Sequence, residues 1–280
     1  MTESLVLDIT TVDAFAAQPF SGNPAAVCVT DEVLPDALMQ AIAAEMNLSE
    51  TAFVYPEGQN IYRLRWFTPS SEVDLCGHAT LAAAHVLWER TAVAAGTAIT
   101  FNTRSGALTT QNEGELIAMN FPAEPVDFTQ SQALMPLITQ AIGVPVQTAG
   151  RNRMDYLAVL ESEADVRRAT PDMAAVAALG MRGVIITALA ANAAQYDFVS
   201  RCFYPAVGVP EDPVTGSAHC ALAPWWASRL NRAKLVGWQA SARGGEVGVE
   251  CLDDRVIIRG TATTVLMAEM QIKNLQLFGL

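Results

Sequence analysis

The sequence predicts an α+β protein with two similar halves, each a curved β-sheet around one buried helix. Two segments, HATLAAAHVLWERTA (78–92) and SAHCALAPWWASRLN (217–231), are apolar almost all the way round a helix. A helix of that kind is buried on every side. Much of the remaining chain consists of short strand-like runs, so a strongly curved sheet is the structure expected to enclose each helix. Two such helices therefore predict two cores.

The two buried segments also resemble each other. One follows Phe-Thr-Pro (67–69) and reaches Gly77, and the other follows Phe-Tyr-Pro (203–205) and reaches Gly216. The two glycines are 139 positions apart (216 − 77), half of the 280-residue chain. We interpret this as an internal duplication. Chance similarity between two alanine-rich helices is the alternative.

The other elements are predicted in order along the chain. Short runs that alternate apolar and polar residues, or follow turn residues, predict strands at 5–15, at 25–30 after the turn SGNP, near 50–55 and at 61–67. In the last of these, Tyr62, Leu64 and Trp66 share one face. Apolar residues at helical spacing predict an amphipathic helix over roughly 35–46, and segments near 131–142 and 172–180 are also expected to be helical.

The composition excludes several classes of protein. Half of the chain is apolar (51%) and only 16% is charged, so it can bury a large core. A formal charge of −12 disfavours nucleic acid as a partner, because phosphate binding needs basic patches. No apolar run reaches membrane-spanning length. The start, MTESLVLD, carries acids where a secretory signal carries bases, so we expect a cytoplasmic protein without a membrane association.

The cysteines predict neither disulfides nor a zinc site. Their number is odd, no two form a C-x-x-C pair, and reduced, mostly buried thiols are expected at Cys28, Cys76, Cys202, Cys220 and Cys251. The three histidines show no ligand spacing, so we expect no metal. Dinucleotide and phosphate-loop motifs are also missing, so we expect no organic cofactor.

Both buried helices begin at a glycine, and a helix start is an anion site. The first N–H groups of a helix have no partner within it, and the helix dipole adds partial positive charge. Burial reduces the screening of that field. If the starts at Gly77 and Gly216 face each other across a cleft between the halves, a small carboxylate can bridge them.

Several polar side chains near these starts are candidates for chemistry. Glu50 can act as a general acid–base if its surroundings tune it, although a solvated loop glutamate is the alternative. Asp212 precedes a proline and is equally typical of a turn. His78 is not a favoured capping residue, which points to a ligand contact, whereas Ser217 is a natural N-cap. His85 is expected to be a core histidine.

One basic residue lies in a glycine-rich turn. Arg243 in Arg-Gly-Gly can reach a substrate carboxylate, although a surface turn is the more common reading of that motif. His219 and Cys220 are neighbours in sequence, but adjacent helical positions point in different directions, which argues against a nucleophile pair.

Five motifs together resemble a known family. SGNPAAV, NLSETAFV, FTPSSEVDLCGHATLAAAHVL, GVPEDPVTGSAHCALAPWWA and ARGGEVGV occur in order across nearly the whole chain. They resemble the PhzF-like phenazine biosynthesis proteins, relatives of diaminopimelate epimerase. The resemblance implies a diaminopimelate epimerase-like fold of two barrels, residues 1–116 completed by 265–280 and residues 117–264, with the active site between them. It also implies a homodimer with a biosynthetic role.

The resemblance further implies an activity. It suggests a cofactor-independent isomerase that moves a proton on a small carboxylate-bearing substrate, such as a cyclic amino acid. The catalytic candidates by resemblance are Glu50 in NLSETAFV, His78 in CGHAT and Asp212 in EDPVTGS.

The same motifs supply candidate substrate contacts. These are Gly77 and Gly216 at the helix starts, Ser217 beside the second start, Asn23 in SGNPAAV and Arg243 in ARGGEVGV.

Two other functions stay open. Diaminopimelate epimerases use two opposed cysteines; Cys76 matches one, but Thr215 stands at the position of the other. A two-thiol racemase is therefore disfavoured, although a different second base can serve an amino-acid racemase or epimerase. The remaining alternative is a non-enzymatic relative that only binds a small molecule.

Overall fold

The computed structural model describes residues 4–90, 92–94, 96–273 and 275–278. It divides into two units, one of Met1–Asn120 with Gly260–Leu280 and one of Phe121–Arg259. The sequence placed the corresponding boundaries after 116 and after 264. Parts of those predicted ranges, at 1–3, 91, 95, 274 and 279–280, lie outside the described residues.

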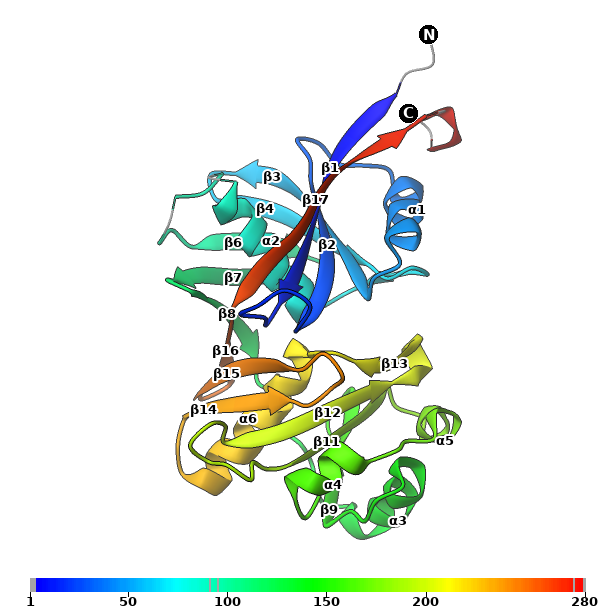
Figure 1. Cartoon of the computed structure of the whole chain (residues 1–280), viewed down its shortest axis with the longest axis vertical. Helices are drawn as coiled ribbons and strands as arrows, with labels where there is room; N and C mark the ends of the chain where they lie inside the picture. Colours follow the sequence, from blue (N-terminus) through cyan, green and yellow to red (C-terminus); the bar gives the residue numbers. More distant parts are fainter. Residues whose placement is uncertain (1–3, 91, 95, 274, 279–280) are drawn as a thin grey trace. The chain divides into compact units, whose positions relative to one another are not determined.

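The first unit contains strands, two helices and a short 3-10 turn (Figure 1). Its elements are β1 (Leu5–Ala14), β2 (Asn23–Val29), α1 (Asp36–Met46), β3 (Glu50–Gly58), β4 (Ile61–Phe67), β5 (Glu72–Val73), α2 (Gly77–Glu89), β6 (Ile99–Thr103), β7 (Gly106–Glu113), β8 (Leu116–Pro122), β17 (Ala262–Ile272) and η2 (Leu275–Phe278). The early strands and α1 lie where the sequence pattern predicts them. In β4, Tyr62, Leu64 and Trp66 are all buried, which confirms the predicted one-sided strand.

The strands of the first unit form one continuous series. β1 pairs with β2 antiparallel, β2 with β3 parallel, β3 with β4 antiparallel, β4 with β6 parallel, and β6–β7 and β7–β8 are antiparallel. β17 returns from the end of the chain to pair with β1. The short β5 pairs with the end of β4, just before α2.

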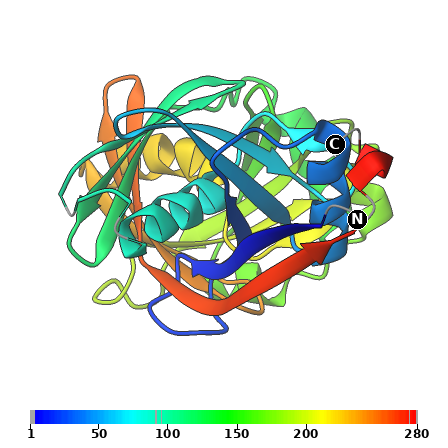
Figure 2. The ribbon, with the colours of Figure 1, turned by 90° about the horizontal axis from the view of Figure 1, so that it is seen from above.

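α2 is the central helix of this unit. Its buried residues extend from Gly77 through Leu87 with the exception of the partly exposed His85, and Glu89 in its last turn is exposed. Alanines at 79 and 82–84 allow close approach to the sheet, and α2 contacts β1, β2, β3 and β17. Figure 2 shows α2 with strands of its own unit around it.

The turn before β2 requires a glycine. Gly22 has φ +63°, and a Cβ there would lie 2.1 Å from the carbonyl oxygen of Ala14. Only glycine adopts that conformation without a clash. The turn leads directly into Asn23, the first residue of β2, whose side chain is fully buried.

The second unit has the same kinds of element. They are α3 (Ser131–Ile142), β9 (Thr148–Arg151), β10 (Asp155–Val159), α4 (Glu163–Arg168), α5 (Met173–Ala178), β11 (Gly183–Leu189), β12 (Phe198–Tyr204), η1 (Pro205–Val207), β13 (Val209–Asp212), α6 (Gly216–Leu230), β14 (Lys234–Gln239), β15 (Gly245–Leu252) and β16 (Arg255–Gly260). The predicted helices near 131–142 and 172–180 correspond to α3 and α5.

The strands of the second unit repeat the pairing order of the first. From β9 through β10, β11, β12, β14 and β15 to β16, the pairings are antiparallel, parallel, antiparallel, parallel, antiparallel and antiparallel. α6 lies in the connection between parallel strands β12 and β14, as α2 does between β4 and β6. The predicted fold of two similar units, each with a central helix, is confirmed.

α6 is buried at its start and exposed near its end. Residues from Gly216 to Ala223 are buried except Ser217, whereas Ser228 and Arg229 are exposed. Trp226 stacks on Phe198 of β12, with ring centroids 5.9 Å apart. α3, α4 and α5 pack in a separate core that includes β9 to β12. Within the described residues, no helix combines the length and apolar character that crossing a membrane requires.

Candidate functional site

Three polar side chains come together at the start of α2. Glu50 is the first residue of β3, Cys76 is the N-cap of α2, and His78 lies in its first turn. β3 pairs in parallel with β2, and Ala25 lies opposite Glu50, which places Asn23 at the same end of the two strands. Residues far apart in sequence therefore meet at one helix start.

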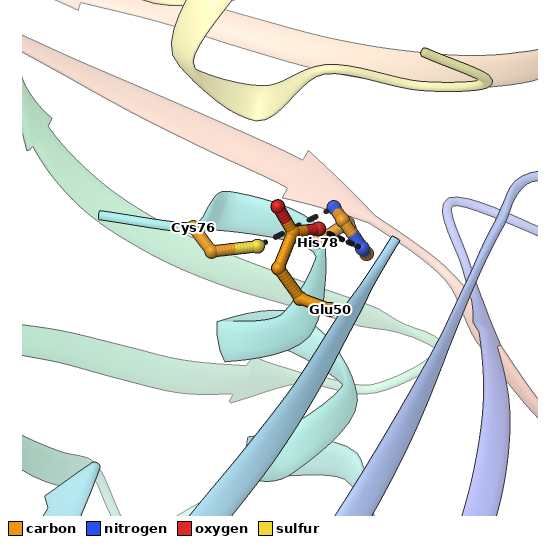
Figure 3. Close-up of side chains that lie close together, drawn as sticks. All are labelled: Glu50, Cys76 and His78. Atoms are coloured by element: carbon orange, nitrogen blue, oxygen red, sulfur yellow. Dashed lines mark hydrogen bonds and ion pairs between the residues drawn. The ribbon is translucent and has the colours of Figure 1, made fainter. Parts of the chain in front are cut away.

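The imidazole of His78 contacts both other members of this group, as the dashed lines in Figure 3 show. Its Nε2 lies 3.3 Å from Oε2 of Glu50. The other ring nitrogen, Nδ1, lies 3.2 Å from Nδ2 of Asn23 and 3.5 Å from Sγ of Cys76. The side chain of Glu50 is 15% exposed, whereas His78 is buried.

Burial decides the charge of this histidine. It lowers the pKa of His78 from 6.5 to about 3, so the ring is neutral at neutral pH. The contact with Glu50 is consequently not an ion pair. When the Asn23 amide donates to Nδ1, the neutral ring carries its proton on Nε2, facing the carboxylate.

A second polar network precedes α6 in the other unit. The hydroxyl of Thr215 donates to Oδ2 of Asp212 at 2.5 Å. Gln239 of β14 donates to the carbonyl oxygen of Asp212 at 2.7 Å and accepts from the backbone N–H of Thr215 at 2.8 Å. Asp212 and Thr215 are both buried. The loop between β13 and α6 is thus fixed by side chains on both sides.

Ser217 does not cap α6, which corrects the sequence interpretation. Thr215 takes the N-cap position and its hydroxyl donates to Asp212, while Ser217 lies inside the first turn. Its Oγ is 3.1 Å from Nη2 of Arg182. The same guanidinium donates to both carboxylate oxygens of buried Asp155, at 2.8 and 2.5 Å.

Sequence reasoning missed Arg182, Asp155 and Gln239. The available signal for Asp155 was an acid at the head of the apolar run DYLAV; the structure shows that it is only 1% exposed and therefore needs a partner. Arg182 also lies over the ring of Tyr204, with its Cζ 4.6 Å from the centroid.

The remaining predicted residues have the following places. Gly77 and Gly216 are the first residues of α2 and α6. Arg243 is partly buried in the loop between β14 and β15. His85 is not a core residue as predicted; its side chain is 22% exposed, and its Nε2 lies 3.1 Å from Oγ1 of Thr264.

The predicted site residues form two groups, one in each unit. Glu50, His78, Gly77 and Asn23 belong to the first unit, and the second holds Asp212, Gly216, Ser217 and Arg243. Their convergence on one ligand stays a prediction.

The first group also contains three side chains of the types that bind metals. One atom each from Glu50, Cys76 and His78 lie within 4.8 Å of one another. The expectation of no metal rested on the spacing of histidines in the sequence, which does not detect a carboxylate, a thiol and an imidazole brought together by folding. All five cysteines are free, and four of them are buried.

Comparisons with known proteins identify the relatives of this chain. The family model described as "Phenazine biosynthesis-like protein" matches residues 12–268. An uncharacterized isomerase of Pseudomonas aeruginosa is 50% identical over 266 residues, covering 95% of this chain and 99% of its own. Another, from Halalkalibacterium halodurans, is 48% identical and covers 92% of this chain and 96% of its own. A PhzF-family crystal structure from Enterococcus faecalis superposes with a TM-score of 0.88 at 43% identity, covering 95% of this chain and 99% of that one.

Proposed function

Because this chain belongs to the PhzF-like phenazine biosynthesis family and is an isomerase, we propose that it moves a proton on a small carboxylate-bearing substrate. The observation that carries the proposal is the contact between Glu50 and a neutral His78, 3.3 Å apart at the start of a buried helix. A carboxylate that is mostly shielded from water is a suitable base for a C–H group.

In the proposed reaction, Glu50 takes a proton from one carbon of the substrate and returns it to another. The electron-rich intermediate needs a hydrogen-bond donor that does not compete with Glu50 for the proton. A neutral imidazole meets that requirement, because its N–H donates while its pKa of about 3 keeps the ring from taking a proton at neutral pH. No metal or organic cofactor has a role in this scheme.

The proposed substrate carries a carboxylate because both central helices begin with glycines. The start of α2 at Gly77 and that of α6 at Gly216 offer backbone N–H groups and partial positive charge. Ser217 adds a hydroxyl at the second start, and Asn23 and Arg243 are further candidate contacts. A cyclic amino acid is the substrate class that we propose to test first.

The test is proton exchange in heavy water over a panel of small cyclic and amino carboxylates. Deuterium incorporation into the substrate is followed by NMR for the wild type and for Glu50→Gln. We expect Glu50→Gln to lose about 10²–10⁴-fold in exchange rate while a substrate analogue still binds.

The matched control is Glu57→Gln, because Glu57 lies on the same strand and its side chain is exposed. Glu211 is a poorer control, since it forms an ion pair with Arg201 at 2.7 Å. Unchanged exchange in Glu50→Gln on a substrate that the wild type turns over contradicts the proposal.

A second candidate function is an amino-acid racemase or epimerase. The observation behind it is the thiol of Cys76, a further proton-transfer group close to Glu50, although inversion at carbon requires the base and the donor to act on opposite faces of the substrate. Chiral analysis of the exchanged product separates the two functions. A racemase inverts the stereocentre, whereas the proposed isomerase moves a proton to a new position.

A further inference from the structure

The group around His78 offers three chemically different metal ligands from separate positions of the chain. A carboxylate oxygen of Glu50, Sγ of Cys76 and a ring nitrogen of His78 lie within 4.8 Å of one another. Tetrahedral zinc with bonds of about 2.0–2.3 Å holds its ligand atoms roughly 3.3–3.7 Å apart. The 3.3 Å from Nε2 to Oε2 already matches that spacing.

We propose that Glu50, Cys76 and His78 form a binding site for a thiophilic divalent cation such as Zn²⁺. The ligands are the Glu50 carboxylate, the Cys76 thiolate and Nε2 of His78. Sγ of Cys76 lies 3.5 Å from Nδ1, so its side chain has to turn toward Nε2 to reach the metal. Thiolate, imidazole and carboxylate together suit zinc or cobalt, whereas magnesium and calcium require oxygen ligands. The two negative charges of thiolate and carboxylate balance the charge of a dication.

The position of Cys76 supports a thiolate. Its side chain is at the N-cap of α2, where the partial positive charge of the helix start favours an anion. The thiol itself is buried, whereas Glu50 keeps 15% of its side-chain surface exposed, so the group is in contact with solvent through the carboxylate.

Asn23 completes the site. A metal on Nε2 leaves the ring proton on Nδ1, which then needs an acceptor. Nδ2 of Asn23 lies 3.2 Å from Nδ1, so a half-turn of the amide brings its oxygen to the same place. Asn23 can therefore donate to Nδ1 when the ring proton is on Nε2, and accept from Nδ1 when a metal occupies Nε2.

A bound cation has a direct consequence for the reaction. A carboxylate that ligates a metal is no longer available as a base, so Zn²⁺ is expected to inhibit proton transfer reversibly. This consequence rests on the proposed function, whereas binding of the metal does not.

Cobalt(II) provides the test without any substrate. The purified, reduced protein is freed of metal with a chelator, which is then removed, and the protein is titrated with Co²⁺. Absorption is followed in the visible and near-ultraviolet regions. We expect one equivalent to give the d–d bands of tetrahedral cobalt and a sulfur-to-cobalt charge-transfer band, and one equivalent of Zn²⁺ to abolish both. Mg²⁺ is expected to displace nothing.

Four variants identify the ligands, and circular dichroism checks that each one folds. Cys76→Ser should remove the charge-transfer band, and Cys251→Ser, which changes a partly exposed cysteine in the other unit, should keep it. Glu50→Gln should keep the band but bind more weakly. Asn23→Ala should weaken binding by about 10–100-fold.

Three outcomes overturn the proposal. The first is the absence of stoichiometric Co²⁺ binding, and the second is binding without a charge-transfer band. The third is a failure of the ligand variants, either a band that survives Cys76→Ser or an affinity for Co²⁺ in Glu50→Gln equal to that of the wild type. Proton exchange measured with chelator present tests the proposed function separately, so failure of one does not imply failure of the other.

Discussion

Arg182 and Ser217 are joined by a hydrogen bond of 3.1 Å between Nη2 and Oγ. The guanidinium is held in place by buried Asp155, so the first turn of α6 is tied to the residue that precedes β11. Because Nη2 donates to this oxygen, the hydroxyl proton of Ser217 does not point at Arg182, and in the proposed function it is the group that donates to the substrate. Arg182 is in this sense a positioning residue.

Removal of Arg182 should destabilise the second unit. Arg182→Met leaves the carboxylate of Asp155, which is 1% exposed, without its ion-pair partner, and we expect a loss of about 3 kcal/mol in the free energy of unfolding. Urea unfolding measures it. Arg167→Met, which removes a partly exposed ion pair with Glu163, is the control and should cost about 0.5 kcal/mol. The double variant Arg182→Met/Asp155→Leu should recover much of the loss; no recovery would show that the pair is not the cause.

Gly183 should not tolerate a side chain. A Cβ there would lie 2.0 Å from the carbonyl oxygen of Phe203 and 2.4 Å from Cδ1 of Tyr204. We expect Gly183→Ala to cost about 1–3 kcal/mol in the free energy of unfolding, because the backbone of β12 has to move. Gly58→Ala is the control, since its Cβ meets only Ile61 at 3.8 Å. Equal unfolding midpoints for the two variants would contradict this expectation.

Thiol chemistry should be dispensable for the proposed isomerase. Cys76→Ser keeps a polar side chain beside Nδ1 of His78, and we expect it to retain most of the exchange rate measured in heavy water. A loss of about a thousandfold, or roughly 4 kcal/mol of barrier, favours the racemase instead. Substrate-free Co²⁺ spectra of the same variant report separately on its role as a metal ligand.

The free energy of unfolding should decrease as the pH is lowered, because the buried His219 resists protonation. Burial lowers the pKa of His219 to about 4 in the folded protein, against 6.5 for the ordinary group. Below pH 6.5 the unfolded chain binds a proton that the native protein does not, so stability falls until about pH 4, where both states are protonated. The unfolded and folded pKa values of His219 differ by about 2.5 (6.5 − 4), which corresponds to roughly 3 kcal/mol in the free energy of unfolding.

Carboxylates also make stability depend on pH, so the contribution of His219 is isolated by comparing variants with the wild type. Urea unfolding between pH 7 and pH 4 should show a shallower loss of stability in His219→Gln than in the wild type. His85→Gln is the control, because that side chain is partly exposed. Parallel pH profiles for His219→Gln and wild type would refute the assignment.

The fold followed from the sequence where local pattern and burial agree. The segments at 78–92 and 217–231 carry apolar residues on every face, so only a central position suits them, and α2 and α6 occupy such positions. Their ends were less predictable. Ser217 has the chemistry of an N-cap, but Asp212 accepts from the hydroxyl of Thr215 and thereby sets the start of the helix two residues earlier.

The candidate site was only partly accessible from the sequence. Glu50 and His78 were selected through the family motifs, and the structure brings them within 3.3 Å. Their contact depends on the parallel pairing of β2 with β3 and on the placement of α2 against both, which no spacing rule contains. Arg182 was missed for the same reason, since Asp155 and Ser217 lie 27 and 35 residues from it.

The return of β17 to β1 affects the order of folding during synthesis. Ala14 pairs with Ala262, so the first unit lacks a strand until nearly the whole chain has left the ribosome. The second unit is continuous in sequence and can close earlier, because all of its strands are made before β17. The sheet of the first unit is therefore completed after that of the second, although most residues of the first unit are synthesised earlier. In that interval the edge of β1 that later pairs with β17 is open and can pair with other chains.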